Sequence, residues 1–323
     1  MSDYNWHNAI TDVPGIKVGH FTDRENRTGL TVILTESGAV AGADLGGGAT
    51  GTRQFDAVSG FHLVTEIQAV LLTGGSAFGL DAAGGVMRFL EEKGQGLLLY
   101  QTYIPTVPTA VIFDLFLSRR RPDADMAYRA CQAAVSGPVE EGSVGVGTGA
   151  VVGKIFGAPF GMKGGMGTAS FSPAPGLVIG ALAVVNAYGD VVETDGKILA
   201  GARTTREGKE FVQMGQRLMH GEKGKDARGE CTTLGVIATN ARLDRMQAIK
   251  VAQMAQDGIS RAISPAHTLY DGDLVICLSV GAEPADLNTL GHTASVLLAD
   301  AIRRGIKAAD GFDLIPAWRD LQG

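Results

Sequence analysis

Residues 231–240 read Cys-Thr-Thr-Leu-Gly-Val-Ile-Ala-Thr-Asn. They follow a charged, glycine-bearing stretch from Gly221 to Glu230, and their apolar, β-branched character favours a buried strand. This junction has two interpretations. Threonine is a common strand residue, so Thr232 can simply begin a strand after a loop. Alternatively, a cut before Thr232 would free an α-amine, with a reference pKa of roughly 7.7 to 8, beside the hydroxyl of the same residue.

The second interpretation gives Thr232 a chemical role. A threonine inside a chain carries no base of its own, whereas an N-terminal threonine can use its α-amine to activate its hydroxyl. An exposed loop that leads into a buried strand is the layout that self-cleavage requires. We therefore expect a single domain, residues 1–323, that is cut into fragments 1–231 and 232–323.

Composition sets the class of protein. With 45% hydrophobic residues, the 323-residue chain can bury a large core. Its 28 Lys and Arg against 34 Asp and Glu give a net charge of −6 without a basic stripe, which disfavours a nucleic-acid partner. Three cysteines without metal-type spacing indicate a reducing compartment. No apolar run reaches about 18 residues, and residues 1–12 lack the apolar core of a signal peptide. We expect no membrane span and a cytoplasmic location.

The order of predicted elements mixes hairpins with crossovers, which favours stacked sheets covered by helices. A glycine-rich loop is expected at 42–51, and an exposed linker at 205–230. The expected strands are 13–18, 29–34, 68–72, 104–115, 177–186, 232–239 and 274–280, and the expected helices are 81–93, 122–135, 244–263 and 289–307.

The segment from Thr73 to Gly79 lies between a predicted strand and a predicted helix, as a phosphate-binding turn would. It lacks the Walker lysine, and its glycines have the wrong spacing for a dinucleotide fingerprint. We interpret it as a tight turn that walls a substrate pocket, with Gly74, Gly75 and Ser76 as candidate pocket residues. Ser76 does not form a Gly-x-Ser-x-Gly nucleophile elbow.

Four further residues carry possible chemistry. Asp271 and Asp273 flank a glycine before a predicted strand, and they form either a plain turn or a pair of carboxylates that binds an ammonium or orients a hydroxyl. Lys154 either extends to solvent or lies near the nucleophile and holds its amine neutral. Asn186 either caps a turn or donates to an oxyanion. The six histidines show no metal spacing, so we expect no metal and no cofactor.

Together these stretches resemble the L-aminopeptidase/D-esterase family, which also contains the β-peptidyl aminopeptidases and the nylon-oligomer (6-aminohexanoate) endohydrolases. The resemblance runs through nearly the whole chain and is closer to the threonine-nucleophile branch than to the serine branch. The segments that carry it are Gly29–Ile33, Leu72–Ala82, Val107–Asp114, Arg121–Asp123, Lys154, Val185–Asn186, Thr232–Asn240 and Asp271–Asp273.

The resemblance implies a four-layer αββα sandwich of stacked mixed sheets covered by helices. It also implies a self-cleaving precursor whose processed units assemble into a homo-oligomer, a tetramer or larger. Thr232 would be the nucleophile, with Lys154 and Asn186 beside it, and Asp271 and Asp273 would position the threonine.

The sequence departs from the family pattern at two places. The family more often has asparagine before the nucleophile, and this chain has Cys231 there. Cleavage depends on the carbonyl of that residue more than on its side chain, so we expect it to proceed; a Cys231 nucleophile is the alternative. The nylon-oligomer branch has a tyrosine where this chain has Phe113, a further candidate pocket residue.

These observations predict a hydrolase of short peptides or amide oligomers, either an aminopeptidase or a 6-aminohexanoate-oligomer hydrolase, with amino-terminated substrates favoured. One alternative is an acyltransferase on the ornithine acetyltransferase plan. A second is an unprocessed, non-enzymatic binding protein in which Cys231 prevents cleavage.

Overall fold

The computed structural model describes residues 6–222, 224 and 229–322, and its central element is β14 (Thr232–Ala241). β14 pairs antiparallel with β11 (Leu177–Asn186) and parallel with β16 (Leu274–Glu283). It is buried along nearly its whole length, which explains its continuous apolar sequence. The register sets Thr232 opposite Asn186, so two residues far apart in sequence meet at one end of the sheet.

The strand β2 (Thr28–Leu45) joins two stacked sheets into one hydrogen-bonded sheet of nine strands, eight of which form a continuous path while β1 pairs with β2 beside it. Its residues 28–35 pair with β1 (Ile16–Asp23), and its residues 40–45 pair with β16. Between these two halves, the pairing of β2 with β4 (Glu66–Thr73) shifts its register. The remaining strands of the path are β10 (Gly165–Ala174), β7 (Thr109–Val111) and β3 (Thr52–Arg53).

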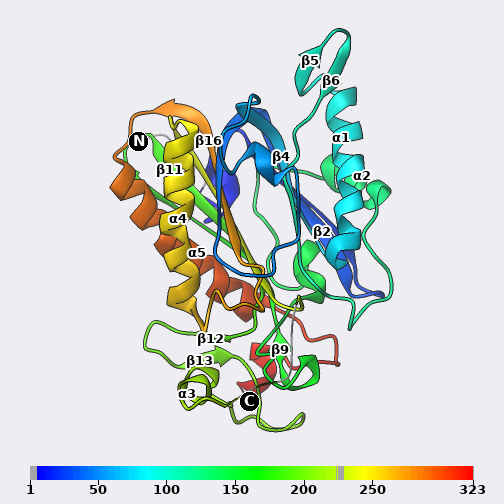
Figure 1. Cartoon of the computed structure of the whole chain (residues 1–323), viewed down its shortest axis with the longest axis vertical. Coiled ribbons are helices and arrows are strands. Elements are labelled where there is room, and N and C mark those ends of the chain that lie inside the picture. Colours follow the sequence, from blue (N-terminus) through cyan, green and yellow to red (C-terminus); the bar gives the residue numbers. More distant parts are fainter. Residues whose placement is uncertain (1–5, 223, 225–228, 323) are drawn as a thin grey trace.

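Helices cover both outer faces, as Figure 1 shows. α4 (Arg245–Ala262) and α5 (Leu287–Ala308) pack together over the sheet that contains β14, and Asp244 and Asp286 cap their first turns through side-chain bonds to backbone N–H groups. α1 (Ala83–Glu92) and α2 (Ala124–Gln132) cover the sheet formed by β1, β4 and the first half of β2.

Strand alternation fills the space between these layers. Leu234 and Val236 of β14 point into the core between the two sheets, and Ile237 points toward α4 and α5. On the other side, Leu30 and Val32 of β2 pack against α1 and α2. The layers therefore run helix, sheet, sheet, helix, which confirms the predicted αββα sandwich.

A smaller sheet and short elements complete the chain. The small sheet has the strand order β13, β12, β15 and lies beside helix α3 at the lower end of the view in Figure 1. The bounds are β12 (Asp190–Val192), β13 (Ile198–Ala200), β15 (Ile263–Ser264), α3 (Met214–Met219), β5 (Leu97–Leu99), β6 (Thr102–Ile104), β8 (Val151–Val152) and β9 (Met162–Lys163), with short 3-10 turns at Ile10–Asp12, Phe55–Ala57, Ser76–Ala82, Gly145–Gly149, Ala158–Phe160 and Trp318–Leu321.

Several predicted boundaries were wrong. The strand expected at 13–18 begins at Ile16 and continues to Asp23. β2 extends into the predicted glycine loop, because Gly42 lets the strand approach α4: a Cβ there would lie 2.2 Å from the backbone N of Ile249. The strand expected at 104–115 is only a three-residue strand, β7, preceded by the end of β6.

The predicted linker at 205–230 is partly structured, because it contains α3, whose Met214 is fully buried. Its residues 223 and 225–228 lie outside the described part of the chain, as do residues 1–5 of the predicted polar N-terminus. Within the described part, no helix combines the length and the apolar character needed to cross a membrane.

Candidate active site

Thr232 begins β14 in a closed environment. Its side chain is only 6% exposed, and the preceding Cys231 is fully buried. The Thr232 hydroxyl donates a hydrogen bond to the carbonyl oxygen of Cys231 at 2.5 Å, and the backbone N–H of Gly272 donates to the same oxygen at 2.8 Å. The carbonyl of the peptide bond between residues 231 and 232 therefore has a hydroxyl on one side and a backbone donor on the other.

Lys154 and Asn186 hold the next carbonyl upstream. Lys154, which follows β8, donates through Nζ to the carbonyl oxygen of Glu230 at 2.5 Å and to Oδ1 of Asn186 at 2.9 Å. Asn186 Nδ2 donates to the same Glu230 oxygen at 3.1 Å and to the carbonyl oxygen of Phe113 at 3.3 Å. Lys154 is fully buried, so the interpretation that it extends to solvent is wrong.

Burial controls the protonation of this lysine. Removal from water disfavours an ammonium, and this lowers the pKa of Lys154, although the nearby ionisable groups of Cys231, Asp271, Glu230 and Asp114 oppose the shift. A neutral amine keeps two N–H donors for its two oxygen acceptors and has one lone pair left over. Lys154 is therefore suited to accept a proton.

Asp271 and Asp273 lie in the turn beside the start of β14, and each is only 1% exposed. Asp273 Oδ1 accepts from the N–H of Thr233 at 2.6 Å. Asp271 Oδ1 accepts from the N–H of Tyr188 at 3.0 Å, and its Oδ2 accepts from the Thr268 hydroxyl at 2.6 Å. Burial, together with the charge of Asp273, raises the pKa of Asp271 to about 6.

The glycine-rich loop after β2 supports this acidic turn. The N–H groups of Gly46 and Gly47 both donate to the carbonyl oxygen of Asp273, at 2.9 and 3.1 Å. A Cβ on Gly47 would lie 2.2 Å from the carbonyl oxygen of Asp271, so only glycine permits the approach. The loop was predicted from sequence, but its role behind the two aspartates was not.

The predicted turn residues Gly74, Gly75 and Ser76 reach the site only indirectly. The N–H of Gly75 donates to Asp114 at 2.8 Å, and a Cβ on Gly74 would lie 2.1 Å from the same carboxylate. Asp114 follows Phe113, whose carbonyl contacts Asn186. Ser76 starts a 3-10 turn, and its N–H donates to the carbonyl oxygen of Ile112. The turn thus holds the segment that carries Phe113.

Sequence reasoning missed His267. Its ring Nδ1 lies 3.0 Å from Oδ2 of Asp273, and its backbone N–H donates to the same oxygen at 3.1 Å. The six histidines are scattered in sequence, so the one signal was that this residue lies just before Asp271 and Asp273. The N–H of Gly272 was also missed, because nearly every residue has a backbone N–H and the sequence does not indicate which one will bind a given oxygen.

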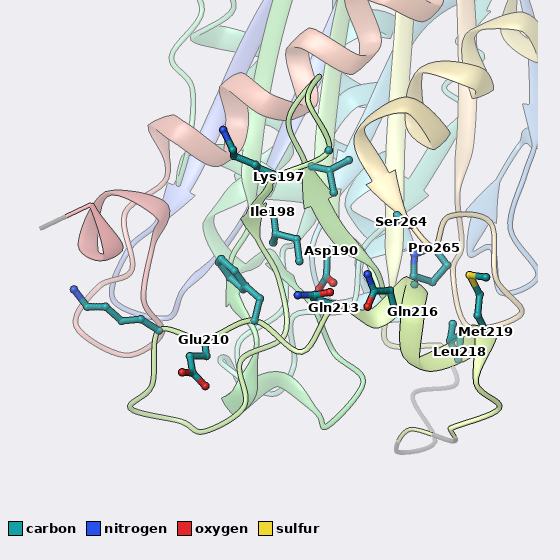
Figure 2. Close-up of a pocket in the computed structure, with 15 residues that line it drawn as sticks. Asp190, Lys197, Ile198, Glu210, Gln213, Gln216, Leu218, Met219, Ser264 and Pro265 are labelled. Carbon is teal, nitrogen blue, oxygen red and sulfur yellow. The ribbon is translucent and has the colours of Figure 1, made fainter.

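The cavity drawn in Figure 2 has a volume of about 1240 Å³ and lies between the small sheet and α3. Asp190, Gln213 and Ser264 line it together with apolar residues of α3, and Thr232 does not. Asp190 in this cavity also has a raised pKa, about 6, but the candidate nucleophile, Lys154 and Asp271 lie together elsewhere, around the bond between residues 231 and 232. We therefore place the candidate site at Thr232.

Comparison with known proteins finds relatives that match nearly the whole chain. The family model described as "Peptidase family S58" matches residues 8–313. An uncharacterized aminopeptidase of Mycobacterium leprae is 38% identical, over 96% of this chain and 93% of its own length. A 6-aminohexanoate-oligomer endohydrolase of a Kocuria species is 28% identical, over 92% of this chain and 85% of its own length.

A solved structure shows the same fold. The L-aminopeptidase D-Ala-esterase/amidase of Ochrobactrum anthropi, described as a variant of the Ntn hydrolase fold, superimposes with a TM-score of 0.71 at 23% identity, covering 98% of this chain and 92% of its own. The chain belongs to peptidase family S58. It is an enzyme that hydrolyses peptide or amide bonds.

Proposed function

We propose that the chain is an N-terminal-threonine hydrolase, which first cuts its own backbone between Cys231 and Thr232. The observation that carries this proposal is the 2.5 Å contact between the Thr232 hydroxyl and the Cys231 carbonyl oxygen, which Gly272 also binds. Nucleophile, electrophile and oxyanion donor therefore already lie together in the uncut chain.

In the proposed self-cleavage, the Thr232 oxygen attacks the carbonyl carbon of Cys231, and Lys154 accepts the hydroxyl proton. The negative charge that develops on the Cys231 oxygen is stabilised by the N–H of Gly272. The bond to the Thr232 nitrogen then breaks and that nitrogen takes up a proton, which leaves an ester between Cys231 and the Thr232 oxygen. Water hydrolyses this ester, which releases the Cys231 carboxylate and frees both the hydroxyl and the α-amine.

In the proposed hydrolysis, the α-amine of Thr232 takes the hydroxyl proton as its oxygen attacks a substrate carbonyl, and then passes the proton to the leaving nitrogen. Departure of the cut end frees Lys154 Nζ and Asn186 Nδ2 from the Glu230 oxygen, so both can bind substrate oxygen. Water then hydrolyses the acyl-enzyme. Nucleophile and base belong to one residue, so the steps need no cofactor.

The proposed substrate is a short peptide or amide oligomer with a free amino group. The buried carboxylates of Asp271 and Asp273 lie beside Thr232 and favour an ammonium group close by. The relatives named as an aminopeptidase and as an oligoamide endohydrolase support this substrate class. Membership of a peptidase family argues against the non-enzymatic binding protein.

Denaturing mass spectrometry tests the proposal. The wild-type chain should appear as fragments 1–231 and 232–323, whereas Thr232→Ala should stay at the full 33.6 kDa and hydrolyse no amide. Thr233→Val is the matched control: the Thr233 hydroxyl is buried without a hydrogen-bond partner among the described residues, so this variant should still be cut. Cleavage of Thr232→Ala at the same bond would refute the proposal.

A further inference from the structure

His267 lies beside Asp273 in an unusual backbone conformation. Its φ angle of 56° is in the left-handed region, which few side chains other than asparagine, aspartate and histidine tolerate. This conformation turns both its backbone N–H and its ring Nδ1 toward the same carboxylate oxygen, at 3.1 and 3.0 Å. The other oxygen of Asp273 binds the N–H of Thr233, so one carboxylate links the imidazole to the strand start that contains Thr232.

A second acceptor, Gln256 Oε1, lies near the ring of His267. His267 Nε2 and Gln256 Oε1 are both buried, and neither has a hydrogen-bond partner among the described residues. Both residues lie against Gly46, where a Cβ would approach His267 Nδ1 at 2.7 Å and Gln256 Oε1 at 2.9 Å. The amide nitrogen of Gln256 donates to Asp44, which leaves Oε1 as the free acceptor. Only a doubly protonated imidazole offers a donor on each nitrogen.

We propose that His267 is a positioning residue for the hydrolytic site, which acts as an imidazolium that offsets the charges of the two buried aspartates and keeps Asp273 directed at the chain around Thr232. This inference rests on the proposed function, because it assigns Asp273 the task of holding the amino end that cleavage creates. A cation is useful here because Asp271 and Asp273 are two buried carboxylates, which repel each other when both are charged.

The charges that face His267 agree with this role. Asp273 contacts the ring directly, Asp271 adds a weaker field, and Asp44 lies behind Gln256. Burial lowers the pKa of the ring, but the hydrogen bond to Asp273 and its charge outweigh burial and hold the pKa above its usual value. His267 therefore keeps its second proton to a higher pH than a free imidazole does.

The test compares pH profiles of His267→Asn and His267→Ala with that of the wild type. Asparagine tolerates the left-handed backbone, and its Nδ2 can replace the ring Nδ1 as a neutral donor. His267→Asn should therefore keep kcat near the wild-type value at alkaline pH. Without the cation, the aspartate pair should protonate more readily, and the acidic limb of kcat/KM, expected near pH 6 from Asp271, should move up by about one pH unit.

His267→Ala removes the donor as well as the charge. It should show the same shift, and its kcat should in addition fall roughly tenfold or more at all pH values. His292→Asn, a substitution at an exposed position on α5, is the control and should match the wild type. The fraction of each variant that is cleaved is measured first, and rates are expressed per cleaved chain.

Two results would overturn the inference. The first is an acidic limb that stays in place in His267→Asn, whether or not kcat falls, since a merely structural histidine gives that pattern. The second is wild-type behaviour of both variants. These results are distinct from failure of the proposed function, in which the wild-type chain would remain uncut or the Thr232→Ala variant would stay active.

Discussion

The hydrogen bonds around Lys154 predict that its replacement lowers catalysis but changes stability little. Its two oxygen acceptors each have another donor: the Glu230 oxygen binds Asn186 Nδ2, and Asn186 Oδ1 binds the N–H of Val151. Lys154→Met should therefore leave few unsatisfied groups, and replacing a buried ionisable side chain with an apolar one of similar size is often neutral for stability. We expect amide hydrolysis to fall about a hundredfold or more, while the melting temperature changes little.

Lys163 is the matched control for this prediction. It is equally buried, but its Nζ donates to three backbone carbonyls, those of Gly147, Ala150 and Gly164. Lys163→Met should lower the melting temperature and leave the specific activity of the folded protein near the wild-type value. If both variants lost stability and activity together, Lys154 would have no separate role in the reaction.

The chemistry of Cys231 disfavours it as an alternative nucleophile. Its thiol is fully buried and packs in a cluster with Ile155, Tyr188 and Met214. Burial raises the pKa of the Cys231 thiol to about 12, with Lys154 opposing the shift, and the reactive species is the thiolate. Burial therefore disfavours the thiolate in the uncut chain, whereas the hydroxyl of Thr232, the proposed nucleophile, lies against a carbonyl.

Sequence and structure agree best where long periodic segments are concerned. The strands around β11, β14 and β16 were predicted almost to their bounds, because each is a continuous apolar run between polar turns. The strand at 104–115 was not, because Pro105 and Pro108 lack the N–H that a ladder needs. The bend of β2 depends on which strands lie beside it, and local sequence does not encode that.

In the candidate site, too, some features could be predicted from sequence and others could not. Side chains that carry chemistry in an unusual context, such as Thr232, Lys154 and the two aspartates, could be singled out from sequence, and the structure brings them together. Contacts made by the backbone could not be predicted from sequence. The Gly272 donor, the Gly47 support and the orientation of His267 depend on φ angles and close approaches that emerge only when distant segments pack.

The contact between α1 and α2 gives opposite predictions for two adjacent glycines. A Cβ on Gly84 would meet nothing within 4 Å, whereas a Cβ on Gly85 would lie 1.7 Å from the carbonyl oxygen of Ala124. Gly84→Ala should stabilise the helix by up to about 1 kcal/mol. Gly85→Ala must push α1 and α2 apart, at a cost of about 1–3 kcal/mol.

Thermal melting of both variants, each combined with Thr232→Ala so that the chain stays whole, measures these effects. We expect the melting temperature to rise by about 2 °C for Gly84→Ala and to fall for Gly85→Ala. Equal shifts of the same sign would mean that the two helices do not meet at Gly85 as described.

Across the whole molecule, the proposed cleavage divides a continuous sheet in an unusual way. β14 and β16 would belong to fragment 232–323, whereas β11 and β2, which flank this pair, would belong to fragment 1–231. α5 of the small fragment also covers β10 and β11 of the large one, and α4 packs against β2. Neither fragment can keep its core without the other.

Cut protein should therefore elute from a size-exclusion column as one species that contains both fragments, and only denaturant should separate them. A homo-oligomer remains a prediction, and light scattering on the same column would give its mass as a multiple of 33.6 kDa. Elution of the small fragment alone under native conditions would contradict the strand order described for β14.

The central place of β14 also determines how long a mature molecule survives. An intact chain that unfolds can refold by itself, but after cleavage two separate polypeptides would have to find each other, at a rate that falls with dilution. Unfolding of a cleaved form would thus be effectively irreversible at low concentration, and its lifetime would be set by the height of the unfolding barrier and not by an equilibrium. Cleavage would therefore make unfolding irreversible, so that a molecule that loses its fold after being cut does not regain activity.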